Sequence, residues 1–267
     1  MKFFLGTHEP HWLDRARGPL FVSRRRLNRL KPSAKAVVPW ALDSGGFSEL
    51  SMFGKWETGP DQYAAEVARY SSQLGGMEWA AVQDWMCEPF IIKKTGLSVR
   101  IHQGRTIQSY YDLHARLPSV QWVPVIQGFT LDEYLNHIEQ YRLCGIDLRN
   151  VPVVGVGSIC RRQATREATR IIRAIHHRGI RIHGFGFKLQ GLRACARYLH
   201  SADSMAWSFD ARRKPPLPGH KHKACSNCLD FAEDWRRKAL ASIDTAMVQP
   251  EQQEIDFPTT DRILFNS

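Results

Sequence analysis

The stretch AVVPWALDSGGFSEL, residues 36–50, runs from a β-rich segment into an aspartate and then into two glycines. Valine and tryptophan favour a strand, and the Asp-Ser-Gly-Gly sequence that starts at Asp43 marks its end. In α/β proteins, ligands bind outside the carboxyl ends of the parallel strands. The stretch therefore predicts a buried strand of an α/β protein, with Asp43 at the edge where a site forms.

Other apolar runs along the chain also end in polar or glycine residues. They are KFFLGTH (2–8), WAAVQDW (79–85), WVPVIQG (122–128), VPVVGVGS (151–158), IRIHGFGF (180–187) and SADSMAWS (201–208). Helix-like segments, such as 59–75, 131–145 and 161–179, lie between most of them. Alternating strands and helices with nearly continuous apolar strands predict a parallel sheet. The polar strand ends favour a TIM-like (β/α)8 barrel over a doubly wound open sheet, although only seven strands are recognisable and the eighth is not evident.

The composition bounds the size of the protein and the class of its partners. A chain of 267 residues suits one large domain, and α/β barrels often have this length. There are 37 Lys and Arg residues against 26 Asp and Glu residues, which gives a net charge of +11. An enzyme that acts on small metabolites does not need an excess of positive charge. A nucleic-acid-binding protein does, because its Lys and Arg side chains neutralise phosphates. The charge therefore favours a nucleic acid as partner.

The chain has no signature of secretion or of a membrane span. Its six cysteines form no disulfide framework, its N-terminal apolar run is too short for a signal peptide, and no stretch approaches ~20 apolar residues. We expect a cytoplasmic protein, in the host cytoplasm if a phage encodes it. We expect a barrel core over residues 1–210. A basic segment over 211–267, with a helix near 229–244 and a polar tail, is expected to pack on it.

Residues at the strand ends form the candidate site. They are Asp43, Asp84, Gln127, Gly155, Gly157, Gly184, Gly186 and Asp203. Two carboxylates in different environments can divide glycosidic chemistry between a nucleophile and an acid–base group. A third carboxylate can accept the adjacent N–H donors of guanine, and an amide with backbone N–H groups suits its carbonyl and ring nitrogens. Phe47, just after the glycine pair, is placed to stack on a flat ring.

Six segments resemble, in the same order, motifs of the tRNA-guanine transglycosylase superfamily. They are DSGGF (43–47), VQDWMCEPF (82–90), VIQG (125–128), VGVGS (154–158), HGFGF (183–187) and ADSMAWS (202–208). The resemblance implies that Asp203 attacks C1′ of a guanine nucleotide and forms a covalent glycosyl–enzyme intermediate. It implies that Asp43 is the acid–base group. No redox or nucleotide cofactor is expected.

The same resemblance implies roles for the remaining strand-end residues. Asp84 and Gln127 would hold the base, and Phe47 would stack on it. The glycine-rich segment would supply backbone N–H groups from Gly155 and Gly157. The segment HGFGF resembles the family's strand-end Gly-x-Gly, and its Gly184 and Gly186 would also belong to the substrate-binding site. Nearby Asp210 is the rival nucleophile, although its basic neighbours favour a surface ion pair.

The superfamily's usual zinc pattern, Cys-x-Cys-x2-Cys with a distant His, is missing from this chain. The segment HKHKACSNC (220–228) instead offers four local ligands, which are His220, His222, Cys225 and Cys228. A Cys-x2-Cys pair preceded by two histidines favours a structural Zn²⁺ clip. The alternative is a basic loop whose His and Lys side chains contact phosphate.

The short chain, the DSMAWS form and the His/Cys segment together resemble the compact DNA-modifying branch, the 7-deazaguanine DNA transglycosylases of phages and bacteria. This resemblance implies that guanine in duplex DNA is exchanged for a free 7-deazaguanine base such as preQ0. It also implies that the modified base in DNA blocks cleavage by restriction enzymes. Three alternatives stay open: the same exchange on tRNA, a non-catalytic nucleic-acid-binding barrel, and a hydrolase that releases the base. The sequence carries no sign of the oligomeric state.

Overall fold

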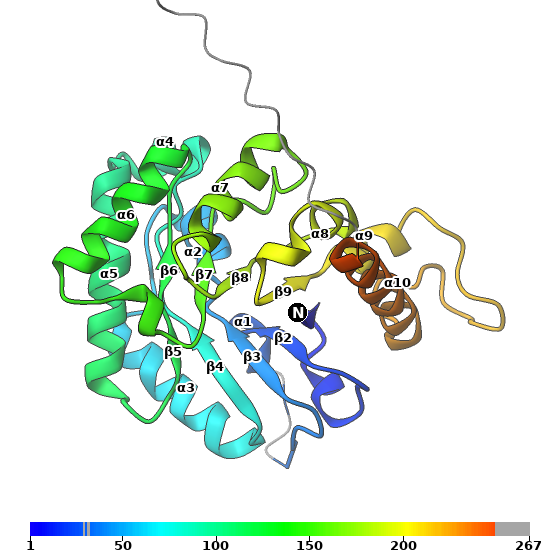
Figure 1. The fold of residues 1–267 in the computed structure, drawn as a ribbon. Helices are drawn as coiled ribbons and strands as arrows, with labels where there is room; N and C mark the ends of the chain where they lie inside the picture. The colour runs from blue at the N-terminus through cyan, green and yellow to red at the C-terminus, as the bar shows by residue number, and fades with distance from the viewer. Residues whose placement is uncertain (29, 31–32, 249–267) are drawn as a thin grey trace, which may run out of the picture.

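The computed structural model describes residues 1–28, 30 and 33–248, and its strands form a single parallel sheet (Figure 1). The strands are β1 (Lys2–Thr7), β2 (Leu20–Ser23), β3 (Trp40–Asp43), β4 (Met77–Ala81), β5 (Trp122–Val123), β6 (Val125–Ile126), β7 (Val154–Val156), β8 (Ile182–Gly184) and β9 (Ser201–Ser204). Their order is β5-β4-β3-β2-β1-β9-β8-β7-β6. Residues 249–267, the end of the expected C-terminal segment, lie outside the described residues.

The two ends of this order meet at Pro124, which alone separates β5 from β6. Proline has no N–H to donate, so the ladder is interrupted there. The flanking carbonyls are nevertheless paired on both sides. The N–H of Val82 donates to the carbonyl of Val123 at 3.3 Å, and the N–H of Gly155 donates to the carbonyl of Pro124 at 2.9 Å. Since β5 and β6 are two halves of one strand, the nine strands fill eight barrel positions, and the expected TIM-like (β/α)8 barrel is confirmed.

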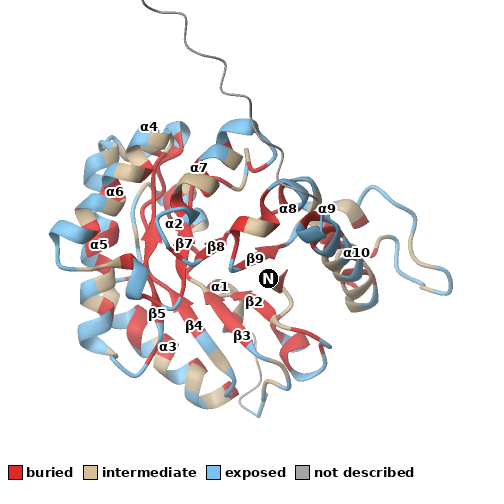
Figure 2. Cartoon of the chain, in the orientation of Figure 1, coloured by how far each residue is buried: buried red, intermediate tan, exposed pale blue. Residues whose placement is uncertain are grey.

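The strand that the sequence patterns left unassigned is β2. Its four residues, LFVS, lie between β1 and β3 in the barrel, where Leu20 is in register with Leu5 on one side and Trp40 on the other. Such a short strand shows no clear periodicity. Its first three residues are buried all the same, as are most strand residues in Figure 2.

Side chains on the inner face of the barrel are mainly aromatic and small apolar residues. Successive side chains of a strand point to opposite faces. Asp43 lies two residues beyond Ala41 on β3, and Ser23 two residues beyond Phe21 on β2, so both face the interior at its carboxyl end. The buried interior cluster contains Phe4, Phe21, Ala41, Trp79, Ala81, Val123 and Val153.

Helices surround the barrel and begin after the carboxyl ends of the strands. They are α1 (Arg24–Leu27), α2 (Gly46–Phe53), α3 (Pro60–Leu74), α4 (Pro89–Thr95), α5 (Val99–Arg116), α6 (Leu131–Leu143), α7 (Arg166–His176), α8 (Leu189–Cys195), α9 (Ala206–Ala211) and α10 (Leu229–Val248). Short 3-10 helices are η1 (Pro10–Asp14), η2 (Leu148–Asn150) and η3 (Ala196–Tyr198). In α7, which lies within the expected helix-like segment 161–179, the residues Ala168, Ile171, Ile172 and Ile175 are all fully buried.

The first two strand connections contain only η1 and α1, which are too short to cover the barrel. Helix α10 lies on this side and packs against β1 and α8 (Figure 1). Its Trp235 ring lies 6.2 Å from the ring of Phe3, measured between centroids. A helix from the end of the described chain thus covers the strand at its beginning.

Candidate active site

A cavity of about 220 Å³ opens at the carboxyl ends of the barrel strands. Its lining includes several of the predicted site residues: Asp43, Phe47, Asp84, Gly157, Gly186 and Asp203. The other predicted ones, Gln127, Gly155 and Gly184, are not part of the lining. A fourth carboxylate that the sequence reasoning did not single out, Glu88, also faces this cavity. Four carboxyl groups therefore surround one space just large enough for a small ring system.

Asp43 is held at the end of β3 by its own loop. Its Oδ1 accepts the N–H of Gly45 at 3.0 Å, and Gly45 adopts a left-handed conformation with φ of +81°. Burial, with a smaller contribution from the negative charge of Asp203, raises the pKa of Asp43 to about 6, although the hydrogen bonds from Gly45 and Ser23 act in the opposite direction. A carboxyl group with a pKa near neutrality can both give and take a proton under physiological conditions.

Asp203 lies on β9, in register with Phe4 of β1, and is buried. Its Oδ1 accepts the N–H of Gly186 at 3.0 Å, and the Nε2 atom of His183 lies 3.4 Å from the same oxygen. Gly186 has a φ of +66°, which glycine adopts readily, and this turn aims its N–H at the carboxylate. One oxygen of Asp203 is thus held by the protein.

Asp84 and Gln127 are joined to each other in a buried network. The amide Nε2 of Gln127 donates to Asp84 Oδ2, and the Ser44 hydroxyl donates to Asp84 Oδ1 at 3.4 Å. The Gln127 Oε1 lies 2.6 Å from the Ser158 hydroxyl, which also lies 2.8 Å from Glu88 Oε2. Burial, together with the negative charge of Asp43, raises the pKa of Asp84 to about 7. The amide of Gln127 is therefore engaged with the protein and orients Asp84.

The glycines of the site mainly make room for neighbouring side chains, and the N–H groups of Gly155 and Gly157 are not free to bind a ligand. The N–H of Gly155 donates to Pro124 and the N–H of Gly157 donates to Ile126, so the barrel ladder uses both groups that were expected to face the base. A Cβ on Gly157 would lie 2.1 Å from Gln127 Nε2. A Cβ on Gly184 would lie 2.7 Å from the ring of Phe187. These residues are small because side chains pack directly over them.

An aromatic and cationic rim borders the cavity. Phe47 and Phe90 are each 41% exposed, with ring centroids 6.3 Å apart. The Arg161 guanidinium lies 4.9 Å from the Phe47 ring centroid and 4.7 Å from that of Phe90. We call Phe47, Phe90 and Arg161 the rim. It combines exposed ring faces with a positive charge, which are the elements that bind unstacked bases and their phosphates.

Other candidate nucleophiles are less suitable than Asp203. Asp210 accepts a hydrogen bond from Trp235 Nε1 at 2.8 Å and does not line the cavity, so it joins α9 to α10. Cys160 does line the cavity, but burial and the charges of Glu88 and Asp203 raise the pKa of its thiol to about 11. It is therefore a thiol and not a thiolate at neutral pH.

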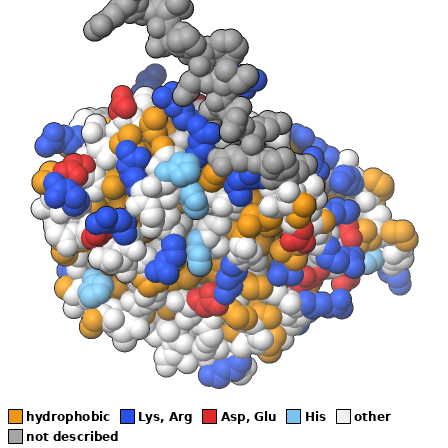
Figure 3. Space-filling view, in the orientation of Figure 1, with side chains coloured by type: hydrophobic (Ala, Val, Ile, Leu, Met, Phe, Trp, Pro, Cys, Tyr) orange, Lys and Arg blue, Asp and Glu red, His pale blue; other side chains and the backbone are white. Residues whose placement is uncertain are grey.

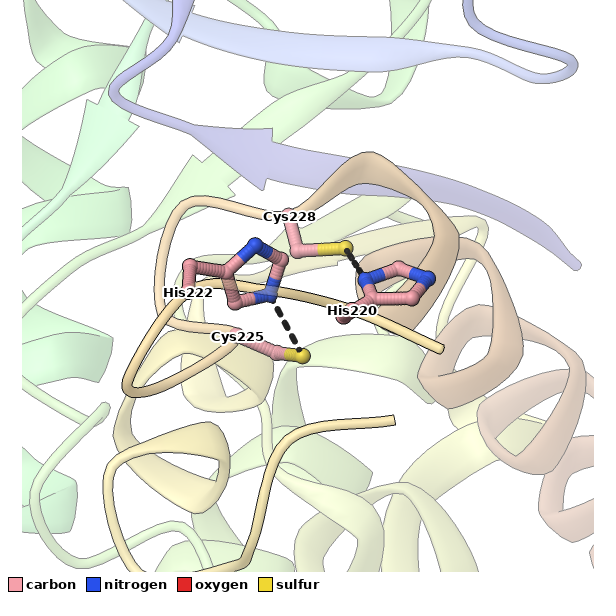
Figure 4. Close-up of side chains that lie close together, drawn as sticks. All are labelled: His220, His222, Cys225 and Cys228. Carbon is pink, nitrogen blue, oxygen red and sulfur yellow. Dashed lines mark hydrogen bonds between the residues drawn. The ribbon is translucent and has the colours of Figure 1, made fainter. Parts of the chain in front are cut away.

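The His/Cys segment folds into a compact group between α9 and α10 (Figure 4). One ligand atom from each of His220, His222, Cys225 and Cys228 lies within 4.8 Å of the others. His220 Nδ1 lies 3.5 Å from Cys228 Sγ and His222 Nε2 lies 3.0 Å from Cys225 Sγ. These separations fit four ligands around one tetrahedral ion, since Zn–N and Zn–S distances are about 2.0–2.3 Å. The group can hold a metal ion.

Two neighbouring contacts support this assignment. The His220 Nε2 atom lies 3.7 Å from Asp230 Oδ2, and a carboxylate on the far nitrogen is usual for a metal-binding histidine. The N–H of Leu217 donates to Cys225 Sγ at 3.4 Å and helps to orient this sulfur. The loop itself is anchored by Ser208, whose hydroxyl donates to the carbonyl of Ser226 at 2.9 Å.

The family model of DeoxyPurine in DNA protein A (DpdA) matches residues 1–259 of the chain. The chain belongs to this family. DpdA is the DNA 7-deazaguanine transglycosylase family of the tRNA-guanine transglycosylase superfamily, so the protein is a pentosyltransferase with a guanine/7-deazaguanine exchange role on DNA. Comparison with the curated proteins gave no match. Among the described residues of this DpdA protein, no helix is long and apolar enough to cross a membrane.

Several residues of this DpdA site were not predicted from sequence. Glu88 and Ser158 belong to segments already recognised, because Glu88 lies within the motif 82–90 and Ser158 ends the motif 154–158. Phe90 ends the motif 82–90 and lies in the first turn of α4, and Arg161 lies in a turn before α7. The sequence does not show that these two side chains meet beside the cavity. A polar residue within a recognised strand-end motif was the one usable signal.

Proposed function

We propose that the protein exchanges guanine in duplex DNA for a preQ0-type 7-deazaguanine through a covalent intermediate on Asp203. The observation that carries this proposal is the pair of Asp43 and Asp203 in one cavity, with the pKa of Asp43 raised to about 6. Two carboxyl groups whose environments differ can act as acid–base group and nucleophile. The family match supports DNA as the substrate.

In the first half-reaction, a carboxylate oxygen of Asp203 attacks C1′ of the deoxyribose as the bond from C1′ to the guanine nitrogen breaks. The electron pair of that bond leaves with guanine, which takes a proton from Asp43. The product is free guanine, a deoxyribosyl ester of Asp203 and an ionised Asp43.

In the second half-reaction, the incoming 7-deazaguanine gives its ring proton to Asp43 and attacks C1′. The ester bond breaks and its electron pair returns to Asp203. Both carboxyl groups regain their starting states, so no cofactor is consumed. Two inversions at C1′ retain the β configuration that DNA requires.

Base selection is assigned to Asp84, whose oxygens accept the two adjacent N–H donors of guanine or 7-deazaguanine when the carboxyl group is ionised. Gln127 and Ser44 orient this carboxyl group. Phe47 stacks on the base from the rim, where its ring is 41% exposed. A 7-deazaguanine has the same hydrogen-bonding edge as guanine, which explains how one cavity serves both bases.

Duplex DNA is the proposed macromolecular substrate, and the target guanine leaves the base stack to reach the cavity. The net charge of +11 suits a polyanion. Lys and Arg side chains are spread over the face drawn in Figure 3, with fewer Asp and Glu side chains among them. DNA that carries the modified base would resist restriction enzymes that contact the major-groove edge of guanine.

We assign the metal of the His/Cys group as Zn²⁺ with a structural task. Two histidines and two cysteines with no open position are the donor set of structural zinc. The four ligands His220, His222, Cys225 and Cys228 fix the loop between α9, which follows Asp203, and α10. No step of the exchange passes through the metal.

The proposal is tested by incubating the purified protein with guanine-labelled duplex DNA and preQ0. Release of labelled guanine that depends on preQ0 is the expected result. Asp203→Ala is the matched variant, because it should still bind DNA but neither release guanine nor form an adduct. Release from tRNA alone would overturn the DNA assignment, and release without preQ0 uptake would indicate a hydrolase.

A further inference from the structure

His183 is a buried polar group that the exchange reaction described above does not use. It lies on β8 inside the barrel and has no exposed surface. Its Nε2 lies 3.4 Å from Asp203 Oδ1, and its Nδ1 lies 2.8 Å from the hydroxyl oxygen of Ser201. Ser201 and Asp203 are two residues apart on β9, so both face the same side of the strand.

Aromatic rings enclose the imidazole on its remaining sides. Measured between ring centroids, Trp79 lies 4.8 Å away, Phe185 4.9 Å, Phe21 5.6 Å and Phe4 5.9 Å. These rings form the apolar interior of the barrel. A polar ring in such surroundings costs free energy unless both nitrogens are hydrogen-bonded. The two contacts to β9 are therefore the reason that a histidine is tolerated at this position.

The partners decide which nitrogen carries the hydrogen. An ionised carboxylate only accepts hydrogen bonds, so the atom that faces Asp203 must be an N–H donor. The Nδ1 atom then accepts the hydroxyl hydrogen of Ser201. The result is a directed chain in which Ser201 donates to His183 and His183 donates to Asp203.

We propose that His183 is a positioning residue for the nucleophile. Together with the N–H of Gly186, it holds Oδ1 of Asp203 and leaves Oδ2 as the atom that attacks C1′. After the attack, Oδ1 is the carbonyl oxygen of the deoxyribosyl ester, and it keeps both hydrogen bonds. When the incoming base displaces the ester, these donors stabilise the returning negative charge. No proton moves at His183 in either step.

This inference rests on the proposed function, in which Asp203 is the nucleophile. Its kinetic test compares His183→Phe, which suits the aromatic surroundings, with His183→Gln, whose amide can place an N–H near the position of Nε2. The measurement is the single-turnover rate of adduct formation on duplex DNA without an incoming base, together with the DNA concentration that gives half the maximal rate. Thermal unfolding of each variant checks that it is folded.

We expect His183→Phe to lower the maximal rate on the order of 10²-fold, the usual effect of removing one aimed donor, with the half-saturating DNA concentration unchanged. His183→Gln should recover at least half of this loss on a logarithmic scale, so that its maximal rate falls by no more than about tenfold. A His183→Phe variant with the wild-type rate would overturn the inference. So would equal losses in both variants, because packing alone would then explain the residue.

A second measurement needs no activity and separates this inference from the proposed function. The ¹⁵N NMR signals of His183 in the free protein report its tautomer. We expect the hydrogen on Nε2, with a shift in that signal in Asp203→Ala and none in the exposed-site variant Asp244→Asn. A hydrogen on Nδ1 would refute the directed chain. If the wild-type protein formed no adduct with any nucleic acid, the proposed function would fail, and this tautomer would still decide whether His183 donates to Asp203.

Discussion

Replacing Asp84 by Asn is expected to stabilise the protein above neutral pH while it removes base recognition. Asp84 is 9% exposed, and burial raises its pKa from 3.8 to about 7. Above this pH the folded protein carries a buried negative charge that the unfolded chain holds in water. Asn has no charge, and its amide can keep the contacts to Gln127 and Ser44.

The sign and size of this effect follow from the two pKa values. Between pH 3.8 and about 7 the folded state binds the proton more tightly, so the contribution of Asp84 to stability is complete below pH 3.8 and is lost as the pH rises through 7. A difference of about 3 units corresponds to at most ~4 kcal/mol. We expect Asp84→Asn to gain about 2–4 kcal/mol at pH 8, or roughly 5–10 °C in Tm for a chain of this size.

The assay is thermal unfolding followed by circular dichroism between about pH 5 and about pH 8. The quantity of interest is the difference in Tm between Asp84→Asn and the wild-type protein at each pH. Asp244→Asn on the exposed side of α10 is the matched control and should show no pH-dependent difference. The reasoning would be refuted by a variant that is no more stable than wild type at pH 8, or by a difference that does not change with pH.

Further predictions concern the acid–base group, the rim, the metal and one glycine. The wild-type rate of adduct formation should fall as the pH rises above about 6, because only protonated Asp43 can serve the leaving guanine; Asp43→Asn should abolish guanine release in the same assay. Arg161→Ala should weaken DNA binding about fivefold and reduce its salt dependence by about one counterion, as measured by fluorescence anisotropy. Cys225→Ser should lose the bound metal and melt at a lower temperature, and a chelator should lower the Tm of the wild-type protein only. Gly157→Ala should displace Gln127 and weaken binding of free 7-deazaguanine at least tenfold in calorimetry, with little change in DNA affinity.

These predictions have controls within the same chain. Arg178→Ala removes a similar charge at an exposed position just beyond the carboxyl end of α7, so its DNA affinity should stay near the wild-type value. If it weakens DNA binding as much as Arg161→Ala, net charge and not the rim determines affinity. A wild-type adduct rate that is flat between about pH 5 and about pH 8 would contradict the role of Asp43.

The sequence predicted the barrel and the residues at its mouth because both depend on local pattern. Apolar runs that end in Asp43, Asp84 and Asp203 are visible without any knowledge of tertiary structure. Strand β2 was missed because four residues are too few for a period to appear. The halves β5 and β6 were expected as one run, 122–128, and the structure explains the break by the missing N–H of Pro124.

Hydrogen-bond partners were the part of the site that the sequence could not provide. The N–H groups of Gly155 and Gly157 were expected to face the base, but the register of β7 against β6 commits them to the ladder. The Gln127 amide was expected to bind the base, and the sequence did not show its contacts to Asp84 and Ser158. Strand register and side-chain networks arise from tertiary packing. The position of a residue at a strand end therefore predicts that it lies near the site, but not which group it hydrogen-bonds to.

The pairing of β1 with β9 has a consequence for the synthesis of the protein. Phe4 and Asp203 are neighbours in the barrel, but a ribosome makes one long before the other. At 5–20 residues per second, the edge of β1 waits roughly 10–40 s for its partner strand. Until then the nascent chain exposes an unpaired strand edge and the apolar side chains that α10 later covers. We therefore expect the yield of active protein in a cell to depend on translation speed and on chaperones that bind such edges.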